Sequence, residues 1–255
     1  GLWNNTLLFF TTDNGGSGSS ASTNWPLRGE KATMWEGGIK GVAFVSGGWL
    51  PPSRRGLVEP GLIHVADLLP TLVAGVAGLA VTAERGAPPL DGVNAVATLT
   101  DGVIVRTEAL LTLVPDFAVL AGGQIRPGWT QAAYRLGELK LIVGLPGDQD
   151  RPSCVAPGCK NGWQRAPDAA SPTWPPPEQP EAATFSPGVW LFNLTADPSE
   201  RTNLADARPD LVAKLRAKID AFNATCVRQA SAFDPPLDPR SDPVKFGGVW
   251  TPWLG

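Results

Sequence analysis

Proline and glycine occur along the whole of this chain and limit how far any helix or strand can extend. Its 255 residues include 26 prolines and 29 glycines. Proline removes a backbone donor from a helix interior, and glycine weakens helices and strands through its conformational freedom. We therefore expect many turns and long surface connections, which disfavours an all-helical bundle.

Composition and charge argue against several classes of protein. Hydrophobic residues make up 43% and charged residues 18% of the chain, as in soluble globular proteins and unlike largely disordered ones. The net charge of -3 argues against nucleic acid as a partner, because such binders usually carry a basic stripe. The longest uncharged apolar stretch, residues 68–81, is shorter than the roughly 20 residues of a membrane span. We expect a buried helix there and no membrane span.

Short apolar runs in the first hundred residues predict strands and one helix. Residues 6–12 have the length and composition of a buried strand that stops at the turn signal D-N-G-G at 13–16, and residues 39–46 form a second such run. Asp67 is placed to cap a helix that holds Pro70 in its first turn. This alternation of strands and helices favours an α/β domain.

The second part of the chain has a different pattern. Residues 131–143 predict a β-hairpin, residues 189–192 predict another strand, and Pro209 opens an amphipathic helix. Residues 165–187 are rich in proline and alanine and predict a surface loop. Strands followed by one helix indicate a small α+β unit.

The D-N-G-G turn carries the sharpest candidate for chemistry. Ligands gather beyond the carboxyl ends of strands in α/β sheets, and the carboxylate of Asp13 beside the amide oxygen of Asn14 suits a hard cation such as calcium. Taken alone, the same residues are also ordinary turn chemistry. Lys31 is the second candidate, as a point charge for a tetrahedral oxyanion, with a solvated surface lysine as the alternative.

Three further residues have structural alternatives to a functional role. Arg28 is open to the same two interpretations as Lys31, and Glu36 is expected to pair with either of these cations. His64 is the single histidine and lies in an apolar run, so a hydrogen-bonded structural role is favoured over acid–base chemistry. No G-x-S-x-G, phosphate-binding loop or Ser/His/Asp order supports a catalytic triad.

Sequons and cysteines bear on the cellular compartment. Three N-x-[ST] sequons, which favour the secretory pathway over a cytosolic location, occur at Asn4, Asn193 and Asn223. The odd number of cysteines permits one local pair and leaves one over, among Cys154, Cys159 and Cys226. We therefore expect a glycoprotein that is lysosomal or extracellular.

A series of short motifs, collinear over nearly the whole chain, resembles the type I sulfatases. The similarity is greatest to the arylsulfatase B-like group, which includes N-acetylgalactosamine-4-sulfatase. The motifs are T-D-N-G-G at 12–16, N-W-P-L-R-G-E-K at 24–31, W-E-G-G-I-K-G at 35–41, L-I-H-V-A-D-L-L-P-T-L at 62–72, L-D-G at 90–92, L-F-N-L-T-A-D-P-S-E-R at 191–201, D-P-R-S-D-P at 238–243 and G-V-W-T-P-W at 248–253.

This resemblance implies an α/β fold like that of alkaline phosphatase. Residues 1–105 would be the C-terminal portion of the large mixed-sheet catalytic domain. Residues 106–255 would be a small C-terminal α+β domain with an antiparallel sheet and one helix. The chain starts at Gly1 and has its single methionine at Met34, so we expect it to be the C-terminal half of a longer protein.

The resemblance also implies a mechanism, in which calcium and a formylglycine serve the hydrolysis of sulfate esters. By motif position, Asp13 and Asn14 would be calcium ligands, and Lys31 would be the catalytic lysine that binds the sulfate. The formylglycine is made from the cysteine of a C-x-P-S-R motif, which does not occur in these 255 residues. We therefore expect it in the N-terminal half and expect this chain alone to be inactive.

The predicted function is that of an arylsulfatase-like sulfuric ester hydrolase acting on sulfated sugars or glycosaminoglycans. The expected partner is a small-molecule or glycan sulfate ester. One alternative is a phosphoryl hydrolase of the same superfamily, since metal and lysine chemistry serves phosphate as well as sulfate. Another is a catalytically dead relative that binds sugars through exposed tryptophans.

Overall fold

The computed structural model describes residues 1–17, 22–81, 89–114, 131–147, 188–226, 240 and 242–249. The chain forms two compact units, residues 1–223 and 224–255. The predicted loop at 165–187 lies outside the described residues, as do Cys154 and Cys159. The domain division after residue 105 stays a prediction. Among the described residues, no helix has the length and apolar character needed to cross a membrane.

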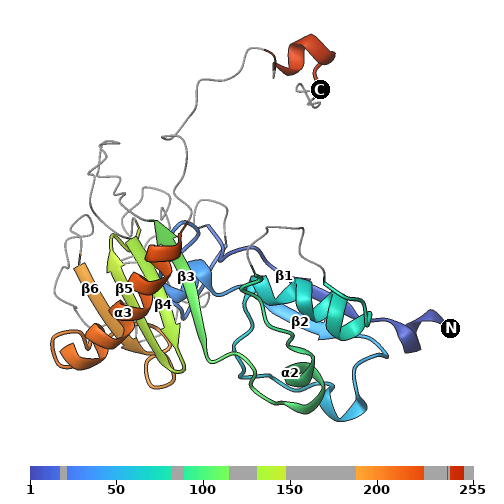
Figure 1. The fold of residues 1–255 in the computed structure, drawn as a ribbon, viewed down its shortest axis with the longest axis horizontal. Coiled ribbons are helices and arrows are strands. Elements are labelled where there is room, and N and C mark those ends of the chain that lie inside the picture. The colour runs from blue at the N-terminus through green and yellow to red at the C-terminus, as the bar shows by residue number, and fades with distance from the viewer. Residues whose placement is uncertain are drawn as a thin grey trace, which may run out of the picture. The chain divides into compact units, whose positions relative to one another are not determined.

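The helices are short except for the last one in the first unit (Figure 1). They are the 3-10 helices η1 (Leu2–Asn5), η3 (Pro52–Arg54), η4 (Val65–Asp67) and η7 (Pro243–Phe246), the π-helical segment η5 (Pro70–Val76), and the α-helices α1 (Glu36–Ile39), α2 (Val96–Asp101) and α3 (Pro209–Thr225). The strands are β1 (Leu8–Thr11), β2 (Ala43–Ser46), β3 (Glu108–Val114), β4 (Gln131–Leu136), β5 (Leu139–Gly144) and β6 (Gly188–Asn193).

The two strands predicted near the N-terminus form an antiparallel pair, β1 with β2. Phe10 lies opposite Phe44, and their rings stack with centroids 5.0 Å apart. The prediction of a buried strand is wrong, because Phe10 and Phe44 are 45% and 51% exposed. Among the described residues this sheet has two strands, too few to enclose an apolar face.

The helix predicted after Asp67 is present but begins and packs differently. His64 caps η4, and Asp67 completes a capping box by accepting a hydrogen bond from the His64 backbone N–H. The helix that follows, η5, starts at Pro70. Its burial was also predicted wrongly, since Leu69 and Leu72 are 50% and 37% exposed.

The second sheet has four antiparallel strands in the order β3-β4-β5-β6. The hairpin predicted over residues 131–143 is confirmed as β4 and β5, with Leu136 opposite Leu139. Gly137 turns the chain between them with a φ of 58°, in the left-handed region that favours glycine. The strand predicted at 189–192 is β6, and the helix predicted from Pro209 is α3.

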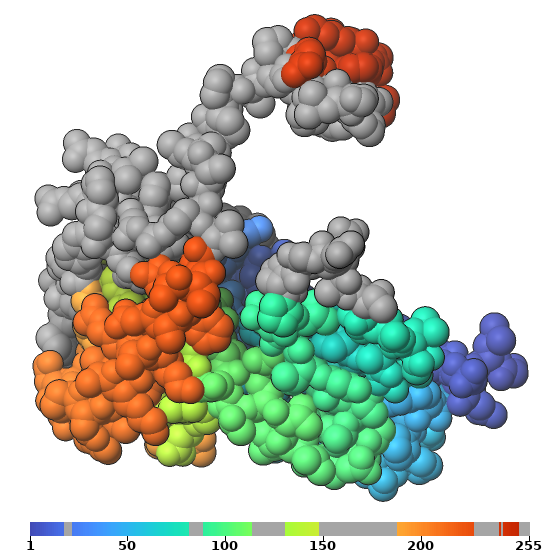
Figure 2. All heavy atoms as spheres, viewed as in Figure 1, coloured from blue at the N-terminus to red at the C-terminus, as the bar shows by residue number. Residues whose placement is uncertain are grey.

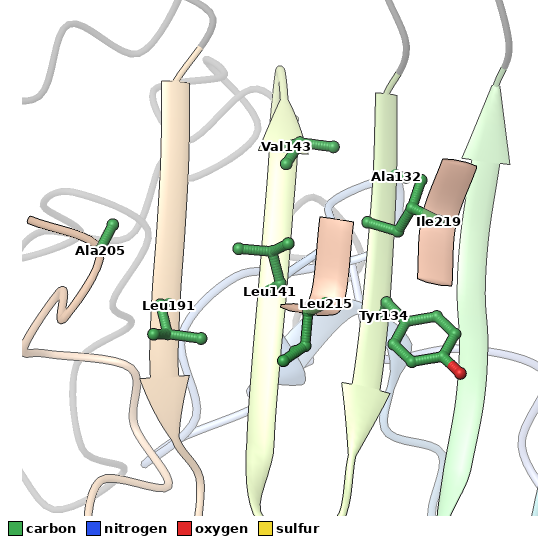
Figure 3. Close-up of a cluster of buried hydrophobic side chains, with 8 residues drawn as sticks. All are labelled: Ala132, Tyr134, Leu141, Val143, Leu191, Ala205, Leu215 and Ile219. Atoms are coloured by element: carbon green, nitrogen blue, oxygen red, sulfur yellow. The ribbon is translucent and has the colours of Figure 1, made fainter. Parts of the chain in front are cut away.

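Helix α3 packs on one face of this sheet and closes the larger of two hydrophobic clusters. Leu215 and Ile219 of α3 are buried and face the sheet (Figure 3). Helix α3, in dark orange, lies in front of the yellow-green strands β4 and β5 (Figure 1 and Figure 2). The buried members of the cluster are Ala132, Tyr134, Leu141, Val143, Leu191, Ala205, Leu215 and Ile219.

The opposite face of the sheet is covered by a segment from the first part of the chain. Trp35 is fully buried there and meets Trp190 and Phe192 edge-on, each with ring centroids 5.8 Å apart. Ala133 and Ile142 belong to the same cluster, because side chains alternate between the two faces of a strand. The four-stranded sheet therefore anchors the chain just after the Lys31 motif.

Candidate functional site

The D-N-G-G turn follows β1 directly and lies against the segment that precedes β2. The Gly15 backbone N–H donates to the Gly38 carbonyl at 2.9 Å, and the Thr12 N–H donates to the Val42 carbonyl at 2.9 Å. The Asn14 side-chain amide donates to the Gly15 carbonyl at 2.7 Å. The side-chain oxygen is the atom of Asn14 that can act as a ligand, because the amide nitrogen only donates hydrogen bonds. Asp13 is exposed.

Lys31 is joined to this turn through its backbone. Its N–H donates to the Gly16 carbonyl at 3.1 Å. Asn24 fixes the same glycine by accepting from the Gly16 N–H at 2.7 Å and donating to its carbonyl at 2.9 Å, and it also donates to Gly29. The structure thus brings the backbones of the three residues predicted from the motifs together at Gly16, and Lys31 is exposed there. Sequence reasoning missed the role of Asn24, whose signal was its place at the start of the N-W-P-L-R-G-E-K motif.

The backbones around the turn approach so closely that side chains are excluded. A Cβ atom on Gly15 would lie 1.7 Å from the Gly37 carbonyl oxygen. A Cβ atom on Gly37 would lie 2.5 Å from the carbonyl oxygens of Arg28 and Gly29. The W-E-G-G motif therefore serves as a close-packed support for the turn that carries Asp13 and Asn14.

Glu36 has a different partner from the one predicted. It was expected to pair with Arg28 or Lys31, but its Oε1 lies 2.9 Å from the Nζ of Lys140 on β5. The same Nζ lies 2.8 Å from Oε1 of Glu200. This ion pair was not predicted because Glu36 and Lys140 are 104 residues apart in sequence.

Arg28 is buried, which contradicts a role in binding an exposed anion. Its guanidinium lies 3.6 Å from the centroid of the Trp35 ring, and it donates to the Glu200 backbone carbonyl at 3.3 Å. Burial lowers the pKa of Arg28 to about 10, in spite of the opposing charges of Glu200 and Asp197. Arg28 therefore remains a cation at neutral pH and serves the packing of the loop.

His64 has the structural role expected of it. Its Nδ1 accepts a hydrogen bond from the Ala66 N–H at 3.2 Å. Burial lowers the pKa of His64, and the charge of Arg106 adds to this, so the imidazole is neutral at pH 7. Asp67 beside it forms a bidentate ion pair with Arg106, at 2.7 Å and 2.5 Å.

The three sequons lie in different environments. Asn4 is exposed in η1. The Oδ1 of Asn193 accepts from the backbone N–H groups of Thr195 and Ala196, each at 3.0 Å. The Oδ1 of Asn223 is buried. Asn4 is therefore the sequon whose side chain is most accessible in the folded chain.

The donor set at the turn fits part of a calcium shell. Asp13 offers a carboxylate and Asn14 an amide oxygen, and calcium takes six to eight such oxygens. Within the described ranges, no group of three or more His, Cys, Asp or Glu side chains is placed to hold a metal ion. Two ligands of the right chemistry are thus present, and the remainder of a shell would have to come from other residues.

Comparison with solved structures defines the class of fold. The chain matches a crystal structure of Ps i-CgsB with a TM-score of 0.54 at 21% identity, over 87% of this chain and 37% of that chain. A second structure, of Ps i-CgsB in complex with k-i-k-neocarrahexaose, gives a TM-score of 0.55 at 21% identity with the same coverage. The fold is the alkaline-phosphatase-like fold of sulfatases, as the sequence resemblance implied.

Comparison with curated proteins defines the family. The chain is 36% identical over 262 residues to arylsulfatase J of Mus musculus, a match that covers 99% of this chain and 40% of that protein. No family model matches the chain. The chain belongs to the type I sulfatase family, and it spans about two fifths of the length of the curated relative it matches.

Proposed function

We propose that this chain is part of a sulfuric ester hydrolase and contributes one side of its active site. The observation that carries the proposal is the hydrogen bond from the Lys31 N–H to the Gly16 carbonyl, which holds the backbone of Lys31 beside the Asp13-Asn14 turn. Oxygen ligands for a cation beside a residue that carries an ammonium group form the arrangement needed to bind and polarise a tetrahedral oxyanion.

Each of the three side chains has one role in this proposal. The Asp13 carboxylate and the Asn14 amide oxygen would hold calcium, with the Asn14 nitrogen kept away by its bond to Gly15. Lys31 would bind the sulfate oxygens and balance the negative charge that grows during the reaction. When bound, calcium would polarise the sulfate, and the nucleophile would be a formylglycine outside these 255 residues.

The substrate proposed is a sulfate ester on a sugar, and the compartment proposed is lysosomal or extracellular. The sugar is supported by the structural neighbour that was solved with an oligosaccharide. The compartment is supported by the exposed sequon at Asn4. Aryl sulfates are suitable test substrates, because the name of the curated relative is arylsulfatase J.

The test is hydrolysis of an aryl sulfate by the full-length protein with added calcium. We expect Lys31→Met and Asp13→Asn to lower kcat/KM by about 100-fold or more, as loss of a charge-stabilising group does. Lys214→Met, which removes an exposed lysine of α3, is the matched control and should keep the wild-type rate. Chelation of calcium should abolish turnover.

Two outcomes would contradict the proposal. One is a wild-type rate in Lys31→Met. The other is faster turnover of the matching aryl phosphate than of the aryl sulfate, which would favour a phosphoryl hydrolase.

A further inference from the structure

A buried cluster of charged side chains joins the Lys31 segment to the four-stranded sheet. We call Glu36, Lys140 and Glu200 the charge cluster. Lys140 and Glu200 are fully buried and Glu36 is 5% exposed. Lys140 Nζ lies 2.9 Å from Glu36 Oε1 and 2.8 Å from Glu200 Oε1. One ammonium group thus bridges two carboxylates that come from distant parts of the chain.

Glu200 makes a second link within the charge cluster. Its Oε2 accepts a hydrogen bond of 2.6 Å from the Glu36 backbone N–H at the start of α1. Glu200 itself has a φ of 54°, in the left-handed region that is unfavourable for a residue with a side chain. The chain accepts this strained backbone at a residue whose carboxylate is directed at both Glu36 and Lys140.

Stability alone gives a weak reason for such a cluster. Removing charges from water is costly, and apolar residues of similar volume often give equal or greater stability at buried ion pairs. Burial raises the pKa of Glu200, and neighbouring Glu36 raises it further, although Lys140 opposes the shift. The hydrogen bonds from Lys140 to Glu36 and from the Glu36 N–H to Glu200 do, however, fix the relative position of the segments that carry them.

The segment fixed in this way includes Lys31. Glu36 is held to the sheet by Lys140, and the next residue, Gly37, donates its N–H to the Arg28 carbonyl at 2.6 Å. Residues 28–37 therefore form a loop closed at its base, and Lys31 is exposed within it. The Lys31 N–H donates to the carbonyl of Gly16, two residues after Asn14, and so joins this loop to the turn of Asp13 and Asn14.

We propose that Lys140, Glu36 and Glu200 are positioning residues that fix Lys31 relative to Asp13 and Asn14. The catalytic part of this inference, that the charge cluster positions Lys31 for hydrolysis, rests on the proposed function. Its structural part, the tethering of residues 28–37 to the sheet, is measurable independently of activity.

The experiment combines hydrogen–deuterium exchange with kinetics on the full-length protein. Lys140→Met removes the ammonium group, and Glu36→Gln is a milder, nearly isosteric second variant. Lys218→Met is the matched control, because it breaks a lysine–carboxylate pair with Glu108 whose side chains are 44% and 40% exposed. Exchange is compared between peptides that cover residues 12–17 and 28–40 and reference peptides that cover β4 and α3.

We expect Lys140→Met to speed exchange in residues 12–17 and 28–40 at least tenfold and to leave β4 and α3 within twofold. In the same samples kcat/KM for an aryl sulfate should fall at least tenfold, while the control keeps both values. If Lys140→Met does not fold by circular dichroism, the same criteria apply to Glu36→Gln.

Unchanged exchange in residues 28–40 would overturn the inference, because it would mean that no tether exists. An equal rise of exchange in α3 would also overturn it, because it would mean a general loss of stability. Faster local exchange with unchanged kcat/KM would also overturn the positioning role. A wild-type protein without sulfatase activity would instead defeat the proposed function, and the exchange result would still decide whether the tether exists.

Discussion

Gly15 is the residue at which the site tolerates change least. A Cβ atom there would lie 1.7 Å from the Gly37 carbonyl oxygen and 2.7 Å from its carbon, and backbone atoms cannot rotate away. We expect Gly15→Ala to lower the free energy of unfolding by about 3 kcal/mol, at the upper end for overpacking. Urea unfolding followed by circular dichroism measures this change.

Gly56→Ala is the comparison for this prediction. Gly56 has a φ of 72°, and no atom lies within 4 Å of a Cβ atom built there. Gly56→Ala should therefore lower the free energy of unfolding by about 1 kcal/mol, through the left-handed backbone alone. Equal losses in the two variants would show that the close approach at Gly15 does not constrain the fold.

Single residues differ in how well the sequence identified them. Asp13, Asn14 and Lys31 stand in motifs of neighbouring residues, and the structure joins those motifs through Gly16. The partner of Glu36 was predicted wrongly, because Lys140 is 104 residues away and belongs to a strand that reads as apolar. No local pattern contains such a contact, since packing across the sheet creates it.

Helices and strands whose apolar residues repeat at regular spacing were predicted correctly. Those whose bounds depend on packing against distant residues were not. The β4–β5 hairpin and α3 follow from alternation and from the spacing of apolar residues. The run at 39–46 was predicted as one strand, but Ile39 is the last residue of α1 and β2 begins at Ala43. The close approach of Gly37 and Gly38 to the backbone of residues 28–33 requires a turn there.

The ion pair of Asp67 and Arg106 joins η4 to the segment just before β3, and it leads to a prediction about pH. Burial alone would raise the pKa of Asp67, but hydrogen bonds from Arg106, Val93 and His64 outweigh burial and lower it. A lowered pKa in the folded state stabilises the fold above the unfolded pKa, and this contribution is lost as pH falls through the folded value. We expect the wild-type chain to lose stability below about pH 4.

Asp67→Asn should be less stable at pH 7 and should show a flatter dependence of stability on pH in this acid range. Urea midpoints between pH 2.5 and 7 measure both effects. The exposed Asp206→Asn should follow the wild-type curve. If Asp67→Asn follows it as well, the ion pair has no part in acid unfolding.

The first unit, residues 1–223, is the largest compact part of the chain, and its four-stranded sheet has α3 on one face and the Trp35 segment on the other. The family and the fold were predictable from the collinear motifs, because their order extends over nearly the whole chain. The burial of the first sheet was not predictable, because apolar composition indicates a strand but not what covers it.

Glycosylation tests the compartment proposed for the whole protein. We expect the full-length protein from secretory eukaryotic cells to carry a glycan at Asn4, since this sequon is exposed. Asn4→Gln should remove one glycan, seen as a gel shift that matches partial deglycosylation with a peptide N-glycosidase. Asn5→Gln changes the exposed middle residue of the sequon, which tolerates any residue except proline, and should leave the band unchanged. An identical band for Asn4→Gln would argue against modification at this residue.

The pair of strands β1 and β2 has a practical consequence for handling these 255 residues. Each strand has one open edge among the described residues, and the stacked Phe10 and Phe44 lie exposed between Leu8 and Val42, which are 46% and 69% exposed. Open edges with large apolar side chains are templates for added strands, and natural sheets protect them with lysine or proline. Concentrated solutions of the isolated chain are thus expected to aggregate through this pair of strands, and the substitutions Phe10→Lys and Phe44→Lys are expected to improve its solubility.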